Sequence, residues 1–596
     1  MPESAPDTET LPSRIAALVH THFDGLPKRS KPVLRDDGTA EWIPMTGIVL
    51  VKGANTPAEQ LTCVTVTTGA KCLPASQIPS CNGLVLHDCH AEILAMRAFN
   101  YWLLSECRAI LTSEQQWLSH SSDGKRVSGP PSPSPYIRRR LRQIEETTGP
   151  ESDALFPPFE ICPDVDIYMY CTCAPCGDAS MELVMAAQDD PTPWALPDPG
   201  PALSNTASPP LTGRGHFSQL GIVRRKPARA DAESTKSKSC SDKIALRQVT
   251  SLLNYESSLL VAVTANAYIK GLVMPEEEIN KSGCERCFGG EENGRMRCLN
   301  GRVWPVDVDA NADSIPGFGE QAGRNRDRDS DSERCNRYSY AFRPFEVLSI
   351  PNTQLRSLWA FRKPRATDSV REGEAQDASR PQVKKTKPGT ISAVWVRAPT
   401  PTPFPGSTTN SPNSSLESAM AACDNGTKTL PVLRGSRTGL FESIINGVRQ
   451  GHKASAPGPG IRGASALCRA RMWEHWKGAA SNAILRSFNA GTGPVCENDH
   501  GDGSVKTRSS RLNKEISTAF QASTYREFKK ELNLGVSSGV VLARKQAMGA
   551  AKDVLGGWVP NDGDEGWGWR SNLGKLVDAE GNLVEMDPKG SKKRKR

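Results

Sequence analysis

The sequence has no long apolar run. No stretch of 18 consecutive apolar residues occurs among its 596 residues, which excludes a transmembrane helix of ordinary length. Its first ten residues, MPESAPDTET, have neither the basic region nor the apolar core of a signal peptide, so we expect no secretory leader and no membrane partner. Without a leader, the 17 cysteines are expected to be thiols or metal ligands rather than a disulfide framework.

Apolar residues are also scarce overall. They make up 37% of the chain, which contains 50 glycines and 45 prolines. At about 150 residues per domain the length would allow three or four domains, but this composition favours fewer domains with long insertions. The net charge of +8 says little about a nucleic-acid partner, because residues 589–596 hold six basic residues and no acid, which leaves +2 elsewhere.

The segments with periodic patterns predict an alternation of strands and helices. The expected strands are 42–51, 61–69 and 166–173. The expected helices are 13–24, 176–188 and 240–260, and 86–106 is expected to be a loop that enters a further helix. Pattern returns at 465–477 and 523–534, which we interpret as a helical C-terminal extension. The order β-β-α-β-α predicts an α/β fold of three layers, with a mixed sheet flanked by helices.

Segments rich in proline and serine, or with alternating charges, interrupt this pattern and cannot bury enough apolar surface to order themselves. We therefore expect a disordered N-terminus at 1–14, a single domain at 15–575 and a basic tail at 576–596. Disordered insertions are expected near 119–155, 189–238, 276–337, 364–392 and 398–430.

The clearest chemical signal is His90-Ala91-Glu92 followed far downstream by Pro175-Cys176. The motif His-x-Glu, followed downstream by Pro-Cys, is typical of zinc-dependent base deaminases. Such a site needs three protein ligands and one open position for water, whose pKa the metal lowers. His90 and Cys176 are the predicted ligands. Glu92, two residues later in the same helical turn, is the carboxylate predicted to shuttle protons between the water and the base.

The third ligand is not fixed by this pattern, because Cys176 is followed by Gly-Asp-Ala rather than by a second cysteine. Cys240 lies at a predicted helix N-terminus, where partial positive charge favours a thiolate. Cys173 is the alternative, since it forms a C-x-x-C pair with Cys176. The residues alone leave both candidates open.

Four motifs together resemble a known family: TGAKC (68–72), LHDCHAE (86–92), PCGDA (175–179) and SCSDK (239–243). They are similar to the adenosine deaminase/editase domain shared by double-stranded RNA editing deaminases and tRNA-specific adenosine deaminases. The resemblance covers residues 15 to 575 and implies a cytidine-deaminase-like core. It implies that His90, Cys176 and Cys240 hold one zinc ion, and so selects Cys240 over Cys173. It also implies that Glu92 protonates N1 and then the amine while adenosine is hydrolysed at C6 to inosine.

The resemblance further implies a buried inositol hexakisphosphate, a polyanion that needs many lysine and arginine donors. Asp88 and Lys243 would form a relay between this group and the zinc site. Met96 and Leu246-Arg247 depart from the pattern of the RNA editors. The positions that match the phosphate-binding residues of the family are Arg97, Lys243, Arg469, Tyr525, Lys529 and Trp558.

Within the family, Ser180 directly after CGDA and IALRQ after SCSDK resemble the tRNA enzymes that act on adenosine 37 beside the anticodon of alanine tRNA. Only residues 1–41 precede the first predicted strand, so we expect no duplex-binding domain ahead of it, unlike in the RNA editors. We expect a monomer that binds a tRNA anticodon stem-loop, with Gly69, Ala70 and Lys71 as RNA contacts. The alternatives are a deaminase of double-stranded or messenger RNA and a catalytically inactive RNA-binding relative.

Two further features remain. Cys284 and Cys287 with Cys298 and Cys335 would form a second, structural zinc site, but the last two lack paired spacing and we do not favour this interpretation. The terminal SKKRKR is typical of nuclear-localisation signals, so we expect the protein in the nucleus, the cytoplasm or both.

Overall fold

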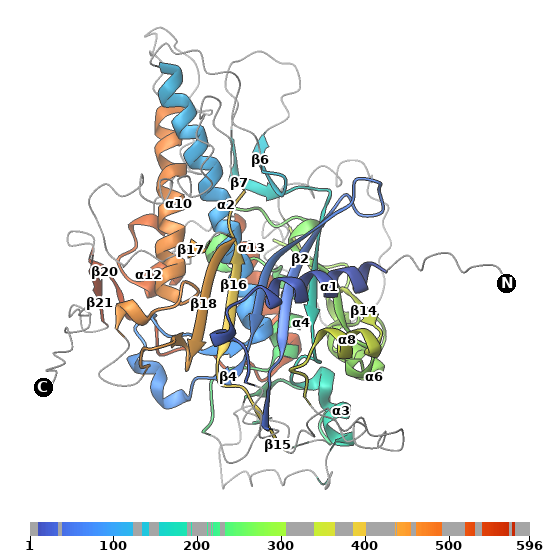
Figure 1. Ribbon diagram of the computed structural model, residues 1–596. Coiled ribbons are helices and arrows are strands. Elements are labelled where there is room, and N and C mark those ends of the chain that lie inside the picture. The colour runs from blue at the N-terminus through green and yellow to red at the C-terminus, as the bar shows by residue number, and fades with distance from the viewer. Residues whose placement is uncertain are drawn as a thin grey trace, which may run out of the picture.

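The structure is a computed structural model of the whole chain (Figure 1). It describes residues 10–33, 39–122, 134–141, 154–187, 192, 211–212, 216, 218–226, 233–305, 339–363, 385–400, 435–436, 438–454, 460–490, 519–530, 539–570 and 575–578. No helix in these ranges has both the length and the apolar character needed to cross a membrane.

A mixed sheet of nine strands forms the centre of the described structure (Figure 1). Its members are β2 (Met45–Lys52), β3 (Gln60–Thr68), β8 (Val165–Cys171), β11 (Ile269–Pro275), β14 (Glu346–Ile350), β16 (Ser392–Arg397), β17 (Gly435–Ser436), β18 (Gly439–Ile445) and β19 (Val448–Arg449). The order is β14-β11-β8-β2-β3-β16-β18-β17, with β19 also paired to β18. Strand β11 runs parallel to β14 and β8, whereas the pairings from β8 through β18 are antiparallel.

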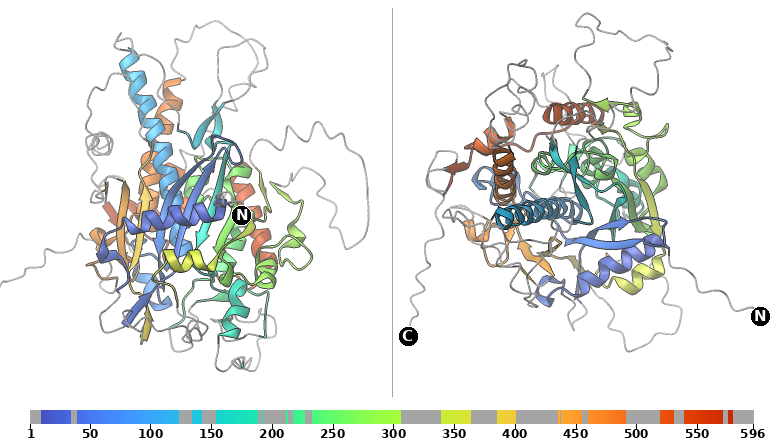
Figure 2. Two further views of the ribbon diagram at one scale, coloured as in Figure 1. Left: turned by 45° about the vertical axis from the view of Figure 1, so that its right-hand side comes forward. Right: turned by 90° about the horizontal axis from the view of Figure 1, so that it is seen from above.

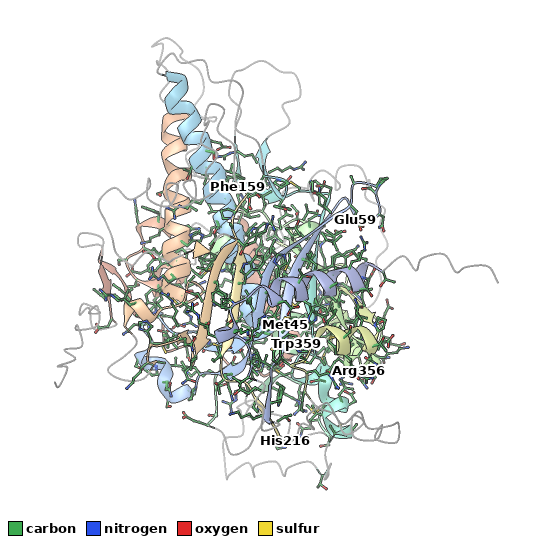
Figure 3. The ribbon with its side chains drawn as sticks, viewed as in Figure 1. Met45, Glu59, Phe159, His216, Arg356 and Trp359 are labelled. Carbon is green, nitrogen blue, oxygen red and sulfur yellow. The ribbon has the colours of Figure 1, made fainter. Side chains whose placement is uncertain are left out.

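Helices cover both faces of the sheet (Figure 2). Side chains of β2 alternate between two apolar clusters: Ile48 and Leu50 belong to the larger one, and Val49 and Val51 to the smaller one. The smaller cluster packs under α1 (Leu11–Asp24) and α8 (Asn352–Leu358) and contains Met45 and Trp359 (Figure 3). The larger cluster packs against α2 (Ala91–Ser122), α4 (Cys240–Thr250), α10 (Arg469–Ala490) and α13 (Gly539–Leu555). The predicted mixed sheet flanked by helices is confirmed.

Smaller elements surround these layers. The two-stranded pairs are β1 (Thr39–Trp42) with β15 (Lys385–Pro388), β4 (Ala70–Cys72) with β5 (Asp88–His90), β6 (Ile137–Leu141) with β7 (Ala154–Ile161), β9 (Leu211–Thr212) with β10 (Arg224–Arg225), β12 (Val303–Trp304) with β13 (Tyr340–Ala341), and β20 (Gly568–Arg570) with β21 (Lys575–Val577). The short helices are α3 (Met181–Ala186), α5 (Tyr255–Ser258), α6 (Lys281–Phe288) and α12 (Tyr525–Lys530), and the 3-10 turns used below are η3 (Asp178–Ser180) and η6 (Arg297–Leu299).

Three helix boundaries differ from those predicted. Helix α1 begins at Leu11 rather than Ser13, because Pro12 fits the first turn of a helix. Residues 176–180 are not helical: Gly177 has a φ of 113°, and η3 precedes α3. The stretch 240–260 is also interrupted, since Ser251 has a φ of 58° and ends α4 before α5 begins.

The predicted insertions are only partly outside the described structure. Of the segment 276–337, residues 276–305 are described and include α6, η6 and β12. Of the segment 189–238, residues 218–226 and 233–238 are described and include β10. Most of the proline- and serine-rich stretches, including 193–210 and 401–434, lie outside the described residues, as do 1–9 and 579–596.

Candidate metal centre and active site

The predicted ligand His90 and the predicted acid Glu92 lie where a short strand turns into a long helix. His90 ends β5, whose register with β4 places Ala70 opposite His90 and Lys71 opposite Cys89. The Gly69 carbonyl accepts a hydrogen bond from the Ala91 amide (3.0 Å), and a Cβ on Gly69 would lie only 1.9 Å from the Cys89 carbonyl oxygen. The conformation of the TGAKC motif therefore requires glycine, and it brings the three predicted RNA-contact residues beside His90.

The two cysteines come from separate loops. Cys176 follows β8, and Cys240 is the first residue of α4, whose N-cap Ser239 accepts a hydrogen bond from the Asp242 amide. The Sγ atoms of Cys176 and Cys240 lie 3.7 and 3.6 Å from His90 Nδ1. The three ligand atoms all lie within 4.8 Å of one another. Cys173 does not join this cluster in the described part of the chain.

These distances match a tetrahedral zinc site. Bonds of about 2.3 Å to sulfur and about 2.0 Å to nitrogen, at a tetrahedral angle, separate the two ligand atoms by about 3.6 Å. The backbone amide of Cys240 donates to Cys176 Sγ (3.4 Å). A hydrogen bond from the Cys240 side chain, together with the charges of Lys226 and His90, holds the pKa of the Cys176 thiol well below its ordinary value. The donor set and its spacing thus fit zinc, with a fourth position left for water.

Glu92 stands at the start of α2 without a partner for one of its oxygens. Its side chain is 5% exposed, and Oε2 is buried with no hydrogen bond. Burial raises the pKa of this carboxyl, and the neighbouring His90 opposes the shift. A buried carboxylate oxygen without a partner is costly in a folded protein, so its retention beside the ligand cluster indicates a chemical role.

Asp88 connects this cluster to two lysines. Its carboxylate accepts from Lys243 Nζ (2.5 Å), from Ser237 Oγ (2.5 Å) and from Lys226 Nζ (2.9 Å). Lys226 Nζ also lies 3.3 Å from Cys240 Sγ. Burial alone would raise the pKa of Asp88, but Lys226 and Lys243 outweigh it and hold that pKa well below its ordinary value.

Lys226 was missed by the sequence analysis. It lies in a segment interpreted as an insertion, and nothing in its local sequence marks it as buried, yet it is 4% exposed. Burial lowers the pKa of Lys226, whereas Asp88 and Cys240 raise it more, so the net shift is upward. A cation beside Cys240 stabilises the thiolate that a metal needs.

A cavity of about 370 Å³ lies between α2, α4, α10, α12 and α13. Four of the six predicted phosphate-binding residues line it: Arg97, Arg469, Tyr525 and Lys529. The other two, Lys243 and Trp558, do not line it, and their assignment stays a prediction. Lys243 is engaged at Asp88, and the Trp558 ring packs under Lys238 Nζ at 5.1 Å. Arg247, Arg544 and Lys545 also line the cavity but were not assigned from the sequence.

The cavity has an excess of positive charge. Its lining includes six cationic side chains against one carboxylate, Glu256. Burial lowers the pKa of Lys529 to about 8, although Glu256 raises it in part. Burial and the nearby Arg544 lower the pKa of Arg247 to about 9. Uncompensated buried charges are expensive, so this lining fits a bound polyanion such as an inositol polyphosphate.

The hypothesis of a second zinc site gains no support. Cys284 and Cys287 are buried on α6, Cys298 is exposed in η6, and Cys335 lies outside the described residues. No metal-type cluster in the described ranges includes any of these cysteines.

Comparison with known proteins agrees with the motifs. Residues 65–126 match the adenosine-deaminase (editase) domain family. The chain is 35% identical over 277 residues to tRNA-specific adenosine deaminase 1 of Schizosaccharomyces pombe, which covers 46% of this chain and 60% of that protein. It is 28% identical over 289 residues to tRNA-specific adenosine deaminase 1 of Saccharomyces cerevisiae, covering 48% and 63%. A match of 40% identity over 72 residues to double-stranded RNA-specific editase B2 of Mus musculus covers 12% and 9%.

The matched part of the chain therefore spans less than two thirds of each of these relatives. The matches nonetheless confirm the resemblance predicted from the four motifs: residues 65–126 are similar to the adenosine-deaminase (editase) domain, and a longer part of the chain resembles tRNA-specific adenosine deaminases.

Proposed function

We propose that this protein is an enzyme that hydrolyses adenosine in tRNA to inosine and ammonia, on a cytidine-deaminase-like core. The observation that carries this proposal is the position of Glu92. Its unpartnered Oε2 is buried two residues after His90, next to a cluster of one imidazole and two thiols. The relatives with the longest alignments quoted above are both named tRNA-specific adenosine deaminases, which supports tRNA as the substrate.

His90, Cys176 and Cys240 would hold zinc, and a zinc ion bound there supplies water that is deprotonated near neutral pH. Glu92 holds a proton at Oε2 and delivers protons first to N1 of the purine and then to the departing amine. Burial and the Cys176 thiol raise the pKa of the Cys240 thiol, and Lys226, which is itself paired with Asp88, opposes this shift from 3.3 Å away. Because a base inside a helix cannot reach a buried carboxylate, the target adenosine must already be unstacked, as in an anticodon loop.

The target within tRNA is proposed from the sequence motifs. We infer that it is adenosine 37 of alanine tRNA, with the anticodon stem-loop bound beside Gly69, Ala70 and Lys71. These residues lie next to His90 through the pairing of β4 with β5. Ser180, which distinguishes this chain from the RNA editors, is 6% exposed and donates to the Gly177 carbonyl (3.3 Å), so its contribution is to the shape of the ligand loop.

Incubation of the purified protein with alanine tRNA should yield inosine at position 37 and nowhere else in the anticodon loop. Sequencing of the treated tRNA detects inosine as guanosine. A transcript with guanosine at position 37 is the control for background. Inosine at other loop positions with none at 37 would contradict the assignment of the site.

Deamination of duplex RNA is the alternative function, favoured by the short match to the double-stranded RNA-specific editase. The same assay separates the two. A tRNA enzyme leaves a long perfect duplex unchanged at enzyme concentrations that convert tRNA fully, whereas an editase converts the duplex and ignores the tRNA. Absence of inosine in both substrates would instead indicate an inactive RNA-binding relative.

We also propose that inositol hexakisphosphate fills the cationic cavity. Arg97, Arg247 and Arg469 line it from α2, α4 and α10, and Lys529, Arg544 and Lys545 from α12 and α13. A polyanion bound there would neutralise these side chains and join five helices that are distant in the sequence. Its role is structural, since the cavity lining contains none of the proposed zinc ligands and does not contain Glu92.

The stability of the protein should depend on alkaline pH when the cavity is empty but not when it is filled. In the protein without a bound polyanion, burial lowers the pKa of Lys529 from its ordinary value of 10.5 to about 8, so between these values the unfolded chain binds more protons than the folded chain. The free energy of unfolding should therefore increase from pH 8 to 10. Bound inositol hexakisphosphate restores the charge of Lys529 and removes this increase, while adding about 2.7 kcal/mol at 100 times its Kd.

Thermal melting with and without inositol hexakisphosphate at pH 8 and pH 10 measures both effects. Lys529→Met should weaken phosphate binding about 10–100-fold, because it removes a charged hydrogen-bond donor. Lys281→Met, on the exposed surface of α6, is the matched control and should change nothing. Equal melting temperatures with and without the polyanion would refute the assignment of the cavity.

Location and oligomeric state are proposed from the sequence alone. The basic tail at 589–596 supports a nuclear protein, and we propose a monomer.

A further inference from the structure

A buried carboxylate follows each of the two cysteine ligands by two positions. Asp178 comes after Cys176, and Asp242 comes after Cys240. Both side chains are completely inaccessible to solvent. Neither belongs to the cluster of possible metal ligands. Two buried charges at matching positions need partners, and both partners come from the same distant segment of the chain, residues 281–299.

Arg286 of α6 binds the first carboxylate. Its Nε donates to Asp178 Oδ2 (2.8 Å), and its terminal nitrogen donates to the carbonyl oxygen of the same residue (3.0 Å). The other arm of the guanidinium donates to Glu182 Oε1 (2.7 Å) at the start of α3. Arg286 therefore binds both the side chain and the backbone carbonyl of Asp178, in the loop that carries Cys176.

Arg295, which lies between α6 and η6, binds the second carboxylate. Its terminal nitrogen donates to Asp242 Oδ1 (2.8 Å). The other oxygen of Asp242 accepts from Ser239 Oγ (2.5 Å) and from the Arg224 amide (3.0 Å). This carboxylate is thus fully bonded, and it fixes the first turn of α4, where Cys240 lies.

Helix α6 packs closely against the loop that carries Cys176, and this loop packs closely against the residues that precede α4. A Cβ on Gly283 of α6 would lie 2.8 Å from the Ala179 carbonyl, and a Cβ on Gly177 would lie 2.3 Å from Ser239 Oγ. Ser241 Oγ also donates to the carbonyls of Pro175 (3.1 Å) and Cys176 (3.0 Å). In Figure 1, α6 lies beside α3, and α6 also packs against α4. Small movements of α6 must therefore move both ligand loops.

We propose that Arg286 and Arg295 are positioning residues of the metal centre. Together they clamp the two cysteine loops so that both Sγ atoms keep their distances of 3.7 and 3.6 Å from His90 Nδ1. Residues behind the ligands commonly fix ligand orientation, and their loss costs about 10–100-fold in metal affinity or activity. This inference rests on the zinc centre of the proposed function. It adds that α6, in a segment without a motif of its own, determines how tightly the metal is held.

The test measures the rate at which zinc leaves the protein. Purified, zinc-loaded wild type, Arg286→Met and Arg295→Met are mixed with an excess of a chelating dye, and zinc release is followed by absorbance. Both variants should release zinc about 10–100-fold faster than wild type. On tRNA, kcat should fall while KM stays unchanged, because the hydrogen bonds of both arginines go to the cysteine loops and not to Gly69, Ala70 or Lys71.

Two controls separate positioning from general destabilisation. Arg297→Met removes an exposed arginine of η6, from the same segment. Arg356→Met breaks an ion pair with Glu277 (3.1 Å) at the edge of the molecule (Figure 3). Both should release zinc at the wild-type rate. The increase in melting temperature on zinc addition is the second readout: it should shrink in the clamp variants and stay unchanged in the controls, even where a variant melts earlier.

Each outcome bears on a different claim. Wild-type release rates in Arg286→Met and Arg295→Met would overturn the clamp, whatever their melting temperatures. If Arg286→Met does not fold, Arg286→Lys replaces it: this variant keeps the charge but loses the forked contact to Asp178 and Glu182, and wild-type release from it would also overturn the clamp. Failure of the wild type itself to bind zinc would instead refute the metal centre on which the proposed function rests.

Discussion

Glu92→Gln should abolish inosine formation while the protein keeps its zinc. The amide has nearly the same shape as the carboxyl but cannot take up and release a proton. The site offers no substitute, because Glu92 is the titratable carboxyl at the start of α2 and its Oε2 has no other partner. Loss of general acid–base catalysis alone costs about 10²–10⁴-fold. Since this glutamate is proposed to act on two successive proton transfers, we expect a loss at the upper end of that range.

The measurement is the single-turnover rate of inosine formation in alanine tRNA, with zinc content determined on the same samples. Glu346→Gln, on the exposed surface of β14, is the control for loss of one carboxylate and should have wild-type activity. Binding of the tRNA should also be unchanged in Glu92→Gln, because the substitution removes no proposed RNA contact. If Glu92→Gln kept more than a tenth of the wild-type rate, a different group would have to carry the proton.

The site residues that could be predicted from the sequence are those that lie in short local motifs. His90 and Glu92 are two residues apart and are brought together by the start of one helix, so their spacing alone indicates their roles. Cys240 needed the resemblance to the family, because no rule of spacing selects a ligand 64 residues after Cys176. The structure places both thiols beside His90, which agrees with the choice of Cys240 over Cys173.

What the sequence did not predict consists of long-range contacts. Lys226 reaches Asp88 across 138 positions, and Arg286 reaches Asp178 across 108. Arg286, Arg295 and Lys226 lie in polar stretches that were interpreted as insertions. A charged side chain that tertiary contacts bury has the same local sequence pattern as one that is exposed to solvent. The lining of the cavity also depends on long-range contacts. Arg544 lines the cavity from α13, and its position there depends on how α13 packs on α4.

In the fold as well, local elements could be predicted from the sequence, whereas features that depend on distant segments could not. The β-branched runs of β2 and β3 were predicted because strand formation there follows from a local apolar pattern. The end of α4 was not, because Ser251 with its φ of 58° has no turn signal such as glycine or asparagine. The order of the sheet, in which β8 lies between β2 and β11, depends on pairings between distant segments and has no counterpart in any short window of sequence.

Cys240→Ala should remove zinc and activity together, whereas Cys173→Ala should keep both. In the structure Cys240 Sγ is 3.6 Å from His90 Nδ1, the spacing of two ligands on one zinc ion, and Lys226 stands 3.3 Å behind it. Cys173 is outside this cluster.

Zinc content per chain after dialysis against a weak chelator decides between the two cysteines. Since even loss of a residue behind the ligands weakens metal binding about 10–100-fold, loss of a ligand itself should exceed that range and leave Cys240→Ala with essentially no zinc. Cys173→Ala removes a similar volume from the same neighbourhood, so it controls for the small cavity that each substitution creates. Zinc retained by Cys240→Ala and lost by Cys173→Ala would place the metal on the C-x-x-C pair instead. In that case Lys226 would have no thiolate to stabilise, and the clamp on α4 would have no ligand to hold.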